Sequence, residues 1–305
     1  MNLKVFAKNV RHKSVRQKTF AMKVSFVRYE RSFLNALLHE YLGYQILNAD
    51  ESPLYPFRNR GKIVIDRANL NITTWKEKDS KKRVTFFPVV QFSQKLGLVP
   101  AFVLDCKCTK WSIKPLKIEE KKVVYRNEER TLLRKTFKDF VVYYSSNSWI
   151  NGAIYAWELQ RVSLFLKRKT PNTKYLIMVD NVPSHIPTEF SNLKTIFIPP
   201  NCTGKLQPLD CSILATVKNQ YYSWLMKETV ARGPENINLE MAVISMANLF
   251  NSMDVRSINH GFKKTGLSLF QSEPTIEVEL TREEQILNLC ERFDKFACSD
   301  SEGDE

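Results

Sequence analysis

Apolar residues recur along the chain with two different spacings, and these spacings predict an alternation of strands and helices. Short apolar runs that end at turn-forming residues are typical of buried strands. Such runs occupy residues 44–48, 83–92, 98–104, 140–145, 175–179 and 194–198. Apolar residues three or four positions apart predict amphipathic helices instead. These are expected at residues 26–41, 151–168, 213–227, 238–252 and 281–297.

The order of these elements predicts an α/β fold, in which helices pack on a sheet. Residues 105–140 fit neither spacing, because they are basic and irregular apart from a weak strand at 122–125. The end of the chain has four acids in its last seven residues, a composition typical of disorder. We expect four segments: a basic arm with a lead-in helix at 1–43, an α/β domain at 44–228, a helical extension at 229–298 and an acidic disordered tail at 299–305.

Neither a membrane span nor a zinc site is expected. The apolar runs are far shorter than the roughly 20 residues that cross a bilayer. Residues 1–13 contain no continuous apolar stretch, so the start of the sequence does not predict a secretory signal. The six cysteines include no Cys-x-x-Cys pair, and the spacing of Cys106 and Cys108 does not suit zinc. We interpret the cysteines as reduced thiols of a protein inside the cell.

The net charge of the chain predicts the kind of partner that it binds. The chain carries 46 Lys and Arg against 32 Asp and Glu, a formal charge of +14. Such an excess indicates a polyanionic partner, most often a nucleic acid. Residues 1–31 and 58–83 together hold 18 of the 46 basic residues. The candidate phosphate contacts in these two stretches are Lys13, Arg16, Lys18, Arg58, Arg60, Lys81, Lys82 and Arg83.

Three acids stand at the ends of predicted elements. Asp50 and Asp180 each follow an apolar strand, and Asp210 precedes a helix. Ligands of open α/β sheets gather at such strand ends. Magnesium prefers hard oxygen ligands, and a pair of metal ions can promote phosphodiester cleavage. Spacing alone leaves a capping or turn role open for each acid, and Asp105, which also ends a strand, is an alternative third member.

Three ordered motifs carry a family resemblance. The run Asn48-Ala49-Asp50-Glu51-Ser52-Pro53-Leu54 resembles the first acidic motif of DDE superfamily endonucleases. The run from Asp180 to His185 is similar to the second motif, and the stretches 198–203 and 206–210 are similar to the approach to the third. The thirty positions between Asp180 and Asp210 match the pogo/Tigger-like transposases, which include jerky-like and centromere-protein-B-like relatives. The resemblance extends from about residue 33 to about residue 269.

This resemblance implies an RNase H-like fold, a mixed sheet flanked by helices, with a C-terminal helical extension. It implies that Asp50, Asp180 and Asp210 bind a pair of Mg²⁺ or Mn²⁺ ions and that the domain at 44–228 is catalytic. It further implies cleavage and strand transfer of transposon DNA, a nuclear location and DNA as partner. A homodimer is one expected assembly. Full-length relatives carry helix-turn-helix modules before this domain, and here a basic arm is expected in their place.

The alternative interpretation is a non-catalytic DNA-binding relative recruited by a host, or a truncated transposon remnant. An intact set of acids favours the enzyme, whereas missing end-recognition modules favour the alternative.

The neighbours of the acids allow more than one role. Glu51 follows Asp50 at a strand end, so the two side chains are expected to face opposite ways and Glu51 to support the metal ligands from outside. His185 is expected beside them, either orienting a water or phosphate or stabilising the turn after Asp180. Trp149 and Trp157 are expected in the core, although an exposed tryptophan could stack on an unpaired base.

Overall fold

The computed structural model describes residues 40–41, 43–57, 82–125, 128–199 and 202–267. Contacts divide the chain into two units, residues 1–43 with 272–305 and residues 44–271, and all elements below belong to the second unit. The basic arm, the helix at 281–297, the acidic tail and nearly all of the helix at 26–41 lie outside the described residues. So do six candidate phosphate contacts: Lys13, Arg16, Lys18, Arg58, Arg60 and Lys81. In the described part of the chain, no helix is long and apolar enough to cross a membrane.

The strands form two ladders. The first has the order β10, β11, β9, β1, β4, with bounds Glu189–Phe190, Leu193–Phe197, Tyr175–Val179, Gln45–Ala49 and Val89–Gln91. The second has the order β2, β3, β5, β8, β7, β6, with bounds Ser52–Leu54, Val84–Phe87, Ala101–Asp105, Val141–Ser145, Glu128–Thr136 and Lys117–Tyr125. Strands β1, β9 and β11 run parallel, and β4 runs antiparallel to β1.

The two ladders share one register across a single interruption. Ala49 pairs with Val89 before the break, and Ser52 pairs with Phe86 after it, so Asp50 stands opposite Pro88. Proline has no backbone N–H to donate to a ladder, which explains why pairing stops there. The result is a single mixed sheet that is interrupted at Asp50.

Across this sheet the order of the core strands is β5, then β3 continued by β4, then β1 continued by β2, then β9 and β11. Only the strand formed by β3 and β4 runs antiparallel to the others. This is the RNase H-like arrangement, so the predicted fold class is confirmed.

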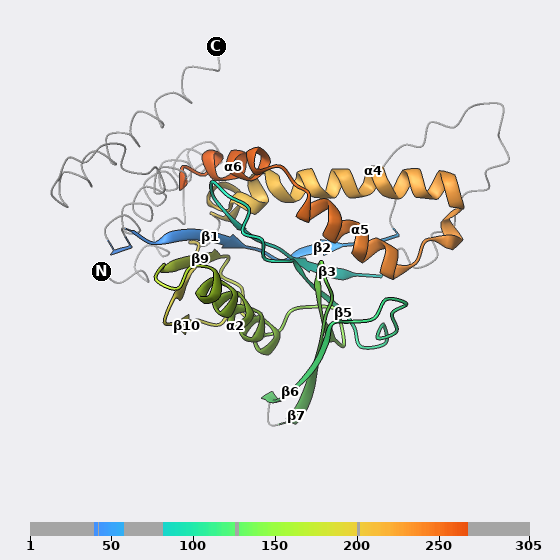
Figure 1. Cartoon of the computed structure of the whole chain (residues 1–305), viewed down its shortest axis with the longest axis horizontal. Coiled ribbons are helices and arrows are strands. Elements are labelled where there is room, and N and C mark those ends of the chain that lie inside the picture. Colours follow the sequence, from blue (N-terminus) through green and yellow to red (C-terminus); the bar gives the residue numbers. More distant parts are fainter. Residues whose placement is uncertain (1–39, 42, 58–81, 126–127, 200–201, 268–305) are drawn as a thin grey trace, which may run out of the picture. The chain divides into compact units, whose positions relative to one another are not determined.

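Helices cover both faces of the sheet (Figure 1). Helix α2 (Gly152–Lys169) packs on one face, where Leu47 and Ala49 of β1 join its apolar cluster. On the other face lie α4 (Leu214–Arg232), α5 (Leu239–Asn251) and α6 (Val255–Lys264). The short helices are α3 (Thr203–Leu206), the π-helix η3 (Leu209–Ile213) and the 3-10 helix η4 (Pro234–Asn236). Burial on both faces explains why the central strands are continuous apolar runs.

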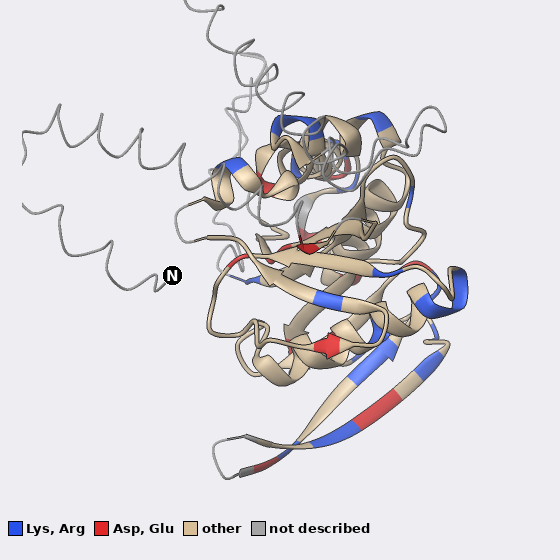
Figure 2. Ribbon diagram, turned by 90° about the vertical axis from the view of Figure 1, so that its left-hand side faces the viewer, with Lys and Arg blue, Asp and Glu red and all other residues tan. Residues whose placement is uncertain are grey.

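The region 105–140 is where the sequence prediction was wrong. Instead of irregular chain it forms a hairpin of two nine-residue strands, β6 and β7. Figure 2 shows this hairpin extending away from the body of the unit, with basic and acidic stretches along its strands. Leu132 is buried, but most hairpin residues face solvent and are charged. The alternation of apolar and polar residues that identifies a half-buried strand is therefore absent.

A buried ionic network fastens α2 to the sheet. Glu158 is 1% exposed, and its carboxylate accepts a hydrogen bond from the Tyr143 hydroxyl at 2.8 Å. Arg161 donates two hydrogen bonds to the same carboxylate, at 2.6 and 2.8 Å, and a third to the Val99 carbonyl at 2.8 Å. Each partner therefore depends on the other, because an isolated buried charge is strongly destabilising.

We expect Glu158→Ala to lower the free energy of unfolding by about 3–5 kcal/mol, since it leaves the Arg161 guanidinium buried without its partner. Glu119→Ala removes the carboxylate of a more exposed pair with Arg134 and should cost about 1 kcal/mol or less. Urea denaturation of the two variants measures both values. Equal losses would contradict the special role of the buried pair.

Candidate active site

The three acids at the ends of predicted elements come together in the structure. Asp50 lies at the interruption of the sheet, Asp180 follows β9, and Asp210 lies in η3. The carboxyl groups of Asp50 and Asp210 hydrogen-bond to each other, and the charge of Asp180 acts on both. Asp105, the alternative third acid, instead accepts a hydrogen bond from the Lys107 backbone at 2.8 Å, as a turn residue does.

Burial and mutual repulsion change the acidity of this cluster. Burial raises the pKa of Asp50 well above its usual value, and the charges of Asp210 and Asp180 raise it further. Burial also raises the pKa of Asp210, although its hydrogen bond with Asp50 acts in the opposite direction. Without a cation, Asp50 therefore keeps its proton more readily than a free carboxyl group does, since it is buried beside two other acids.

Glu51 and His185 lie on the α2 side of this cluster. The Nε2 atom of His185 is 3.1 Å from Glu51 Oε1, and the imidazole stacks on Tyr155 of α2 with ring centroids 4.5 Å apart. The hydroxyl of Ser184 also donates to Glu51, at 3.3 Å. The side chain of Asp50 meets η3, on the other side of the sheet. The neighbouring side chains of Asp50 and Glu51 therefore point to opposite faces of the sheet.

His185 is a buried cation held between acids. Its side chain is 3% exposed, and Nδ1 lies 3.0 Å from the Asp180 carbonyl and 2.8 Å from Asp180 Oδ1. Burial lowers its pKa, but hydrogen bonds with Asp180 and Glu51 outweigh burial and raise the pKa to about 9. The ring is therefore protonated at neutral pH and donates from both nitrogens. Both nitrogens are engaged by the protein, which makes His185 a positioning residue for Asp180.

Asn48 is a residue whose role sequence reasoning missed. Its side chain is fully buried; the amide donates to the Met178 carbonyl at 3.0 Å, and Oδ1 accepts from the Leu209 backbone at 2.9 Å. One amide therefore joins β1, β9 and η3, the three elements that carry the acids. The available signal was a lone polar residue inside the apolar strand that precedes Asp50.

Gly261 is a second residue that the sequence did not reveal as important. A Cβ atom at this position in α6 would lie 2.8 Å from the Pro208 carbonyl oxygen and 2.9 Å from side-chain carbons of Ile213. Backbone and core atoms cannot move aside cheaply, so only glycine lets α6 pack this closely on η3. A π-helix is a rare element that often occurs at functional sites, and here it carries Asp210.

The cluster fits a divalent cation in charge and donor chemistry. Carboxylate oxygens are the ligands that Mg²⁺ and Mn²⁺ prefer. The buried Asp180 Oδ1 has no directed hydrogen bond within the described residues, because the nearby Nδ1–H of His185 points at the Asp180 carbonyl. Among those same residues, no three His, Cys, Asp or Glu side chains are already arranged around a metal position. A cation would therefore replace the proton that burial favours on Asp50.

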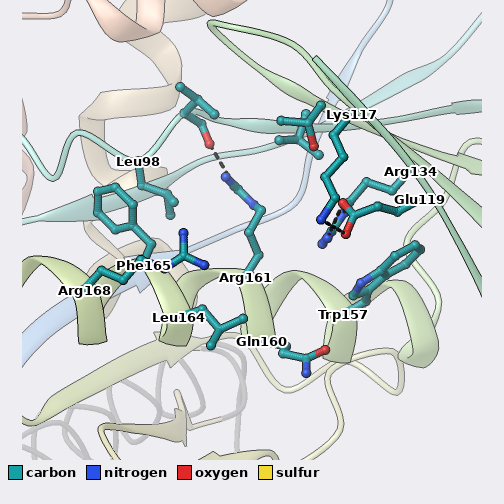
Figure 3. Close-up of a pocket in the computed structure, with 13 residues that line it drawn as sticks. Leu98, Lys117, Glu119, Arg134, Trp157, Gln160, Arg161, Leu164, Phe165 and Arg168 are labelled. Carbon is teal, nitrogen blue, oxygen red and sulfur yellow. Dashed lines mark hydrogen bonds and ion pairs between the residues drawn. The ribbon is translucent and has the colours of Figure 1, made fainter. Parts of the chain in front are cut away.

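A separate cavity of about 320 Å³ lies between α2 and the β6–β7 hairpin (Figure 3). It is bordered by the first residues of β6 and β8, at the opposite end of the parallel strands from the acids. Figure 3 shows Lys117 and Arg134 pointing toward Glu119, which both contact at 2.9 and 2.6 Å. The cavity is therefore separate from the acid cluster, and Lys117 and Arg134 at its border already have an acidic partner.

Comparison with known proteins gives one family match. Residues 120–262, a little under half of the chain, match the family model described as DDE superfamily endonuclease. The matched region contains Asp180 and Asp210, whereas Asp50 precedes it. The assignment to the pogo/Tigger-like branch stays a prediction.

Among solved structures, a pre-cleavage Mos1 transpososome matches 92% of this chain at 15% identity, with a TM-score of 0.44. The catalytic domain of Mos1 mariner transposase matches 83% of the chain at 13% identity, with a TM-score of 0.43. The match covers 63% of the first protein's chain and 90% of the second. At these values the likeness is remote.

We expect Asn48→Ala to lower the free energy of unfolding by about 1–3 kcal/mol, because the Leu209 amide and the Met178 carbonyl lose a buried partner. Asn236→Ala is the matched control, since Asn236 is exposed on η4 and should change stability by less than about 0.5 kcal/mol. Urea denaturation measures both. An Asn48→Ala protein as stable as the control would show that this amide does not hold the three elements together.

Proposed function

We propose that this chain is the catalytic part of a metal-dependent DDE endonuclease that cleaves DNA and transfers the cut strand. The observation that carries the proposal is the convergence of Asp50, Asp180 and Asp210 from three separate elements. Asp50 is buried, Asp180 is half-buried and Asp210 is exposed, so the cluster is open to a ligand from solvent. The match of residues 120–262 to the DDE superfamily endonuclease model supports the reaction class. The net charge of +14 supports DNA as the substrate, and the nucleus is the proposed location.

The three aspartates would hold Mg²⁺ or Mn²⁺. When bound, a pair of such ions activates the attacking oxygen and stabilises the leaving oxygen of a phosphodiester. The surrounding residues keep the carboxylates in place: Asn48 fixes the spacing of β1, β9 and η3, and protonated His185 holds Asp180 beside Glu51. Their positions are set before substrate arrives, which is what a preorganised site requires.

Arg83 and Trp149 form a candidate DNA contact near the cluster. The guanidinium carbon of Arg83 lies 3.4 Å from the ring centroid of Trp149, which is 49% exposed. The charge of Glu51 acts on Arg83, so this pair lies close to the acids. An exposed indole offers a flat apolar surface to an unpaired base, and a guanidinium offers donors to a phosphate. The prediction that Trp149 lies in the core is wrong, whereas Trp157 is buried as expected.

Nicking of supercoiled DNA by the purified chain tests the enzymatic proposal. We expect nicking with Mg²⁺ or Mn²⁺ and none with EDTA, and a loss of about a hundredfold or more in Asp180→Asn, which exceeds the usual effect of residues outside the metal shell. Asp105→Asn is the matched control, because it alters a strand-end aspartate outside the cluster, and it should retain activity.

Nicking that persists in EDTA or equals wild type in Asp180→Asn would overturn the proposal. DNA binding without any metal-dependent nicking would support the non-catalytic alternative instead.

Trp149→Ala tests the DNA contact. Loss of base stacking should raise the dissociation constant for DNA with a single-stranded end by roughly 5- to 100-fold. The salt dependence of binding should stay the same, because indole neutralises no phosphate. Fluorescence anisotropy measures both quantities. Leu164→Ala, which truncates a similarly exposed apolar residue on α2, should bind as wild type; an unchanged affinity of Trp149→Ala would remove this residue from the interface.

A further inference from the structure

Strand β6 is the outer strand of the sheet and offers a long free edge. The ladder ends with β7 followed by β6, and among the described residues no strand pairs with the other side of β6. Figures 1 and 2 both show the β6–β7 hairpin extending away from the helices and the other strands. An edge of nine residues presents a row of backbone donors and acceptors, which makes it a template for another strand.

The edge strand and the residue before it also expose large apolar side chains. Leu116, Ile118 and Val124 are 73%, 57% and 77% exposed. Since side chains alternate along a strand, Ile118 and Val124 share one face with Glu120 and Lys122. Along this face the order is therefore apolar, acidic, basic, apolar. In an antiparallel copy of the strand the order is apolar, basic, acidic, apolar. Each apolar residue can therefore face an apolar one, and each charge can face its opposite.

We propose that two copies of this chain pair antiparallel along β6, around a two-fold axis at Lys121. In this register Ile118 meets Val124 of the second copy, and Glu120 meets Lys122 of the second copy. Each contact occurs twice, because a two-fold interface repeats every contact. Apolar and opposite-charge pairs on one face are the cross-strand contacts that stabilise a sheet. The inference is independent of the proposed catalytic function.

On the face that carries Ile118 and Val124, the pairing of side chains favours this register over its neighbours. An axis at Glu120 places that acid opposite itself and Ile118 opposite Lys122. An axis at Lys122 places that base opposite itself and Glu120 opposite Val124. Like charges directly opposite one another are destabilising. Among these three antiparallel arrangements, only the axis at Lys121 pairs every charge on this face with its opposite.

One contact of the strand opposes this pairing, and one is compatible with it. Lys121 lies opposite itself on the other face, a like-charge contact that weakens the pairing, and its ammonium is 5.9 Å from the Trp157 ring of its own subunit. Lys122 already contacts Glu129, at 3.3 Å, but both side chains are well exposed, at 76% and 63%. Exposed ion pairs contribute little to stability. Lys122 can therefore reach an acid of a second copy at small cost.

Charge reversal on the full chain tests the proposal. Glu120→Lys and Lys122→Glu each convert two attractive contacts into repulsive ones, so each should weaken the dimer at least about tenfold. A mixture of the two variants should form a heterodimer of wild-type strength, because one copy then carries lysine at both positions and faces glutamate at both positions of the other. The double variant should also regain dimerisation. Analytical ultracentrifugation over a range of concentrations measures the dissociation constants.

Two more variants separate this interface from a general effect of charge. Lys138→Glu makes the same charge change on an exposed residue outside β6 and should leave the dimer unchanged. Lys121→Thr removes the like-charged pair at the axis and should tighten the dimer.

A monomeric wild-type chain, single variants that dimerise normally, or a mixture that fails to recover would each overturn the proposal. So would a Lys122→Glu protein that loses DNA affinity alone, since the hairpin would then be a DNA surface. DNA nicking plays no part in these measurements, so the two proposals can fail separately.

Discussion

Three carboxylates lie together in this protein around one that is buried, Asp50, and like charges that lie close to one another repel. Asp50, Asp180 and Asp210 come from a strand interruption, a strand end and a π-helix, so they meet only if three elements are held at fixed spacing. Much of the surrounding structure serves this requirement. The Asn48 amide ties the elements together, and the absence of a side chain at Gly261 lets α6 press η3 into place.

The repulsion itself is reduced in two ways. Burial favours the protonated form of Asp50, which hydrogen-bonds with Asp210, and the His185 cation lies against Asp180. His185 in turn is held by Glu51 and by the ring of Tyr155. The side of the cluster that meets α2 is thus neutralised by the protein. The side that meets η3 keeps negative charge available, which is the property that the proposed cation site needs.

The sequence predicted those parts of the structure whose signal is local. Strand β9 is an apolar run bounded by turn residues, so both its existence and the position of Asp180 at its end follow from the pattern. Asp50 and Asp210 came from motif order, because spacing alone left Asp105 as a rival. Asn48 could not be assigned, since its partner Leu209 is 161 positions away and only the fold brings them together. The β6–β7 hairpin was missed because a solvated ribbon of charged residues has no apolar period.

The proline opposite Asp50 has a mechanical effect on the sheet. Register is the same on both sides of Pro88, yet the backbone hydrogen bonding is interrupted between them. Asp50 lies at that gap, so its own backbone is free of the ladder while the paired residues on both sides, Ala49 with Val89 and Ser52 with Phe86, hold it in place.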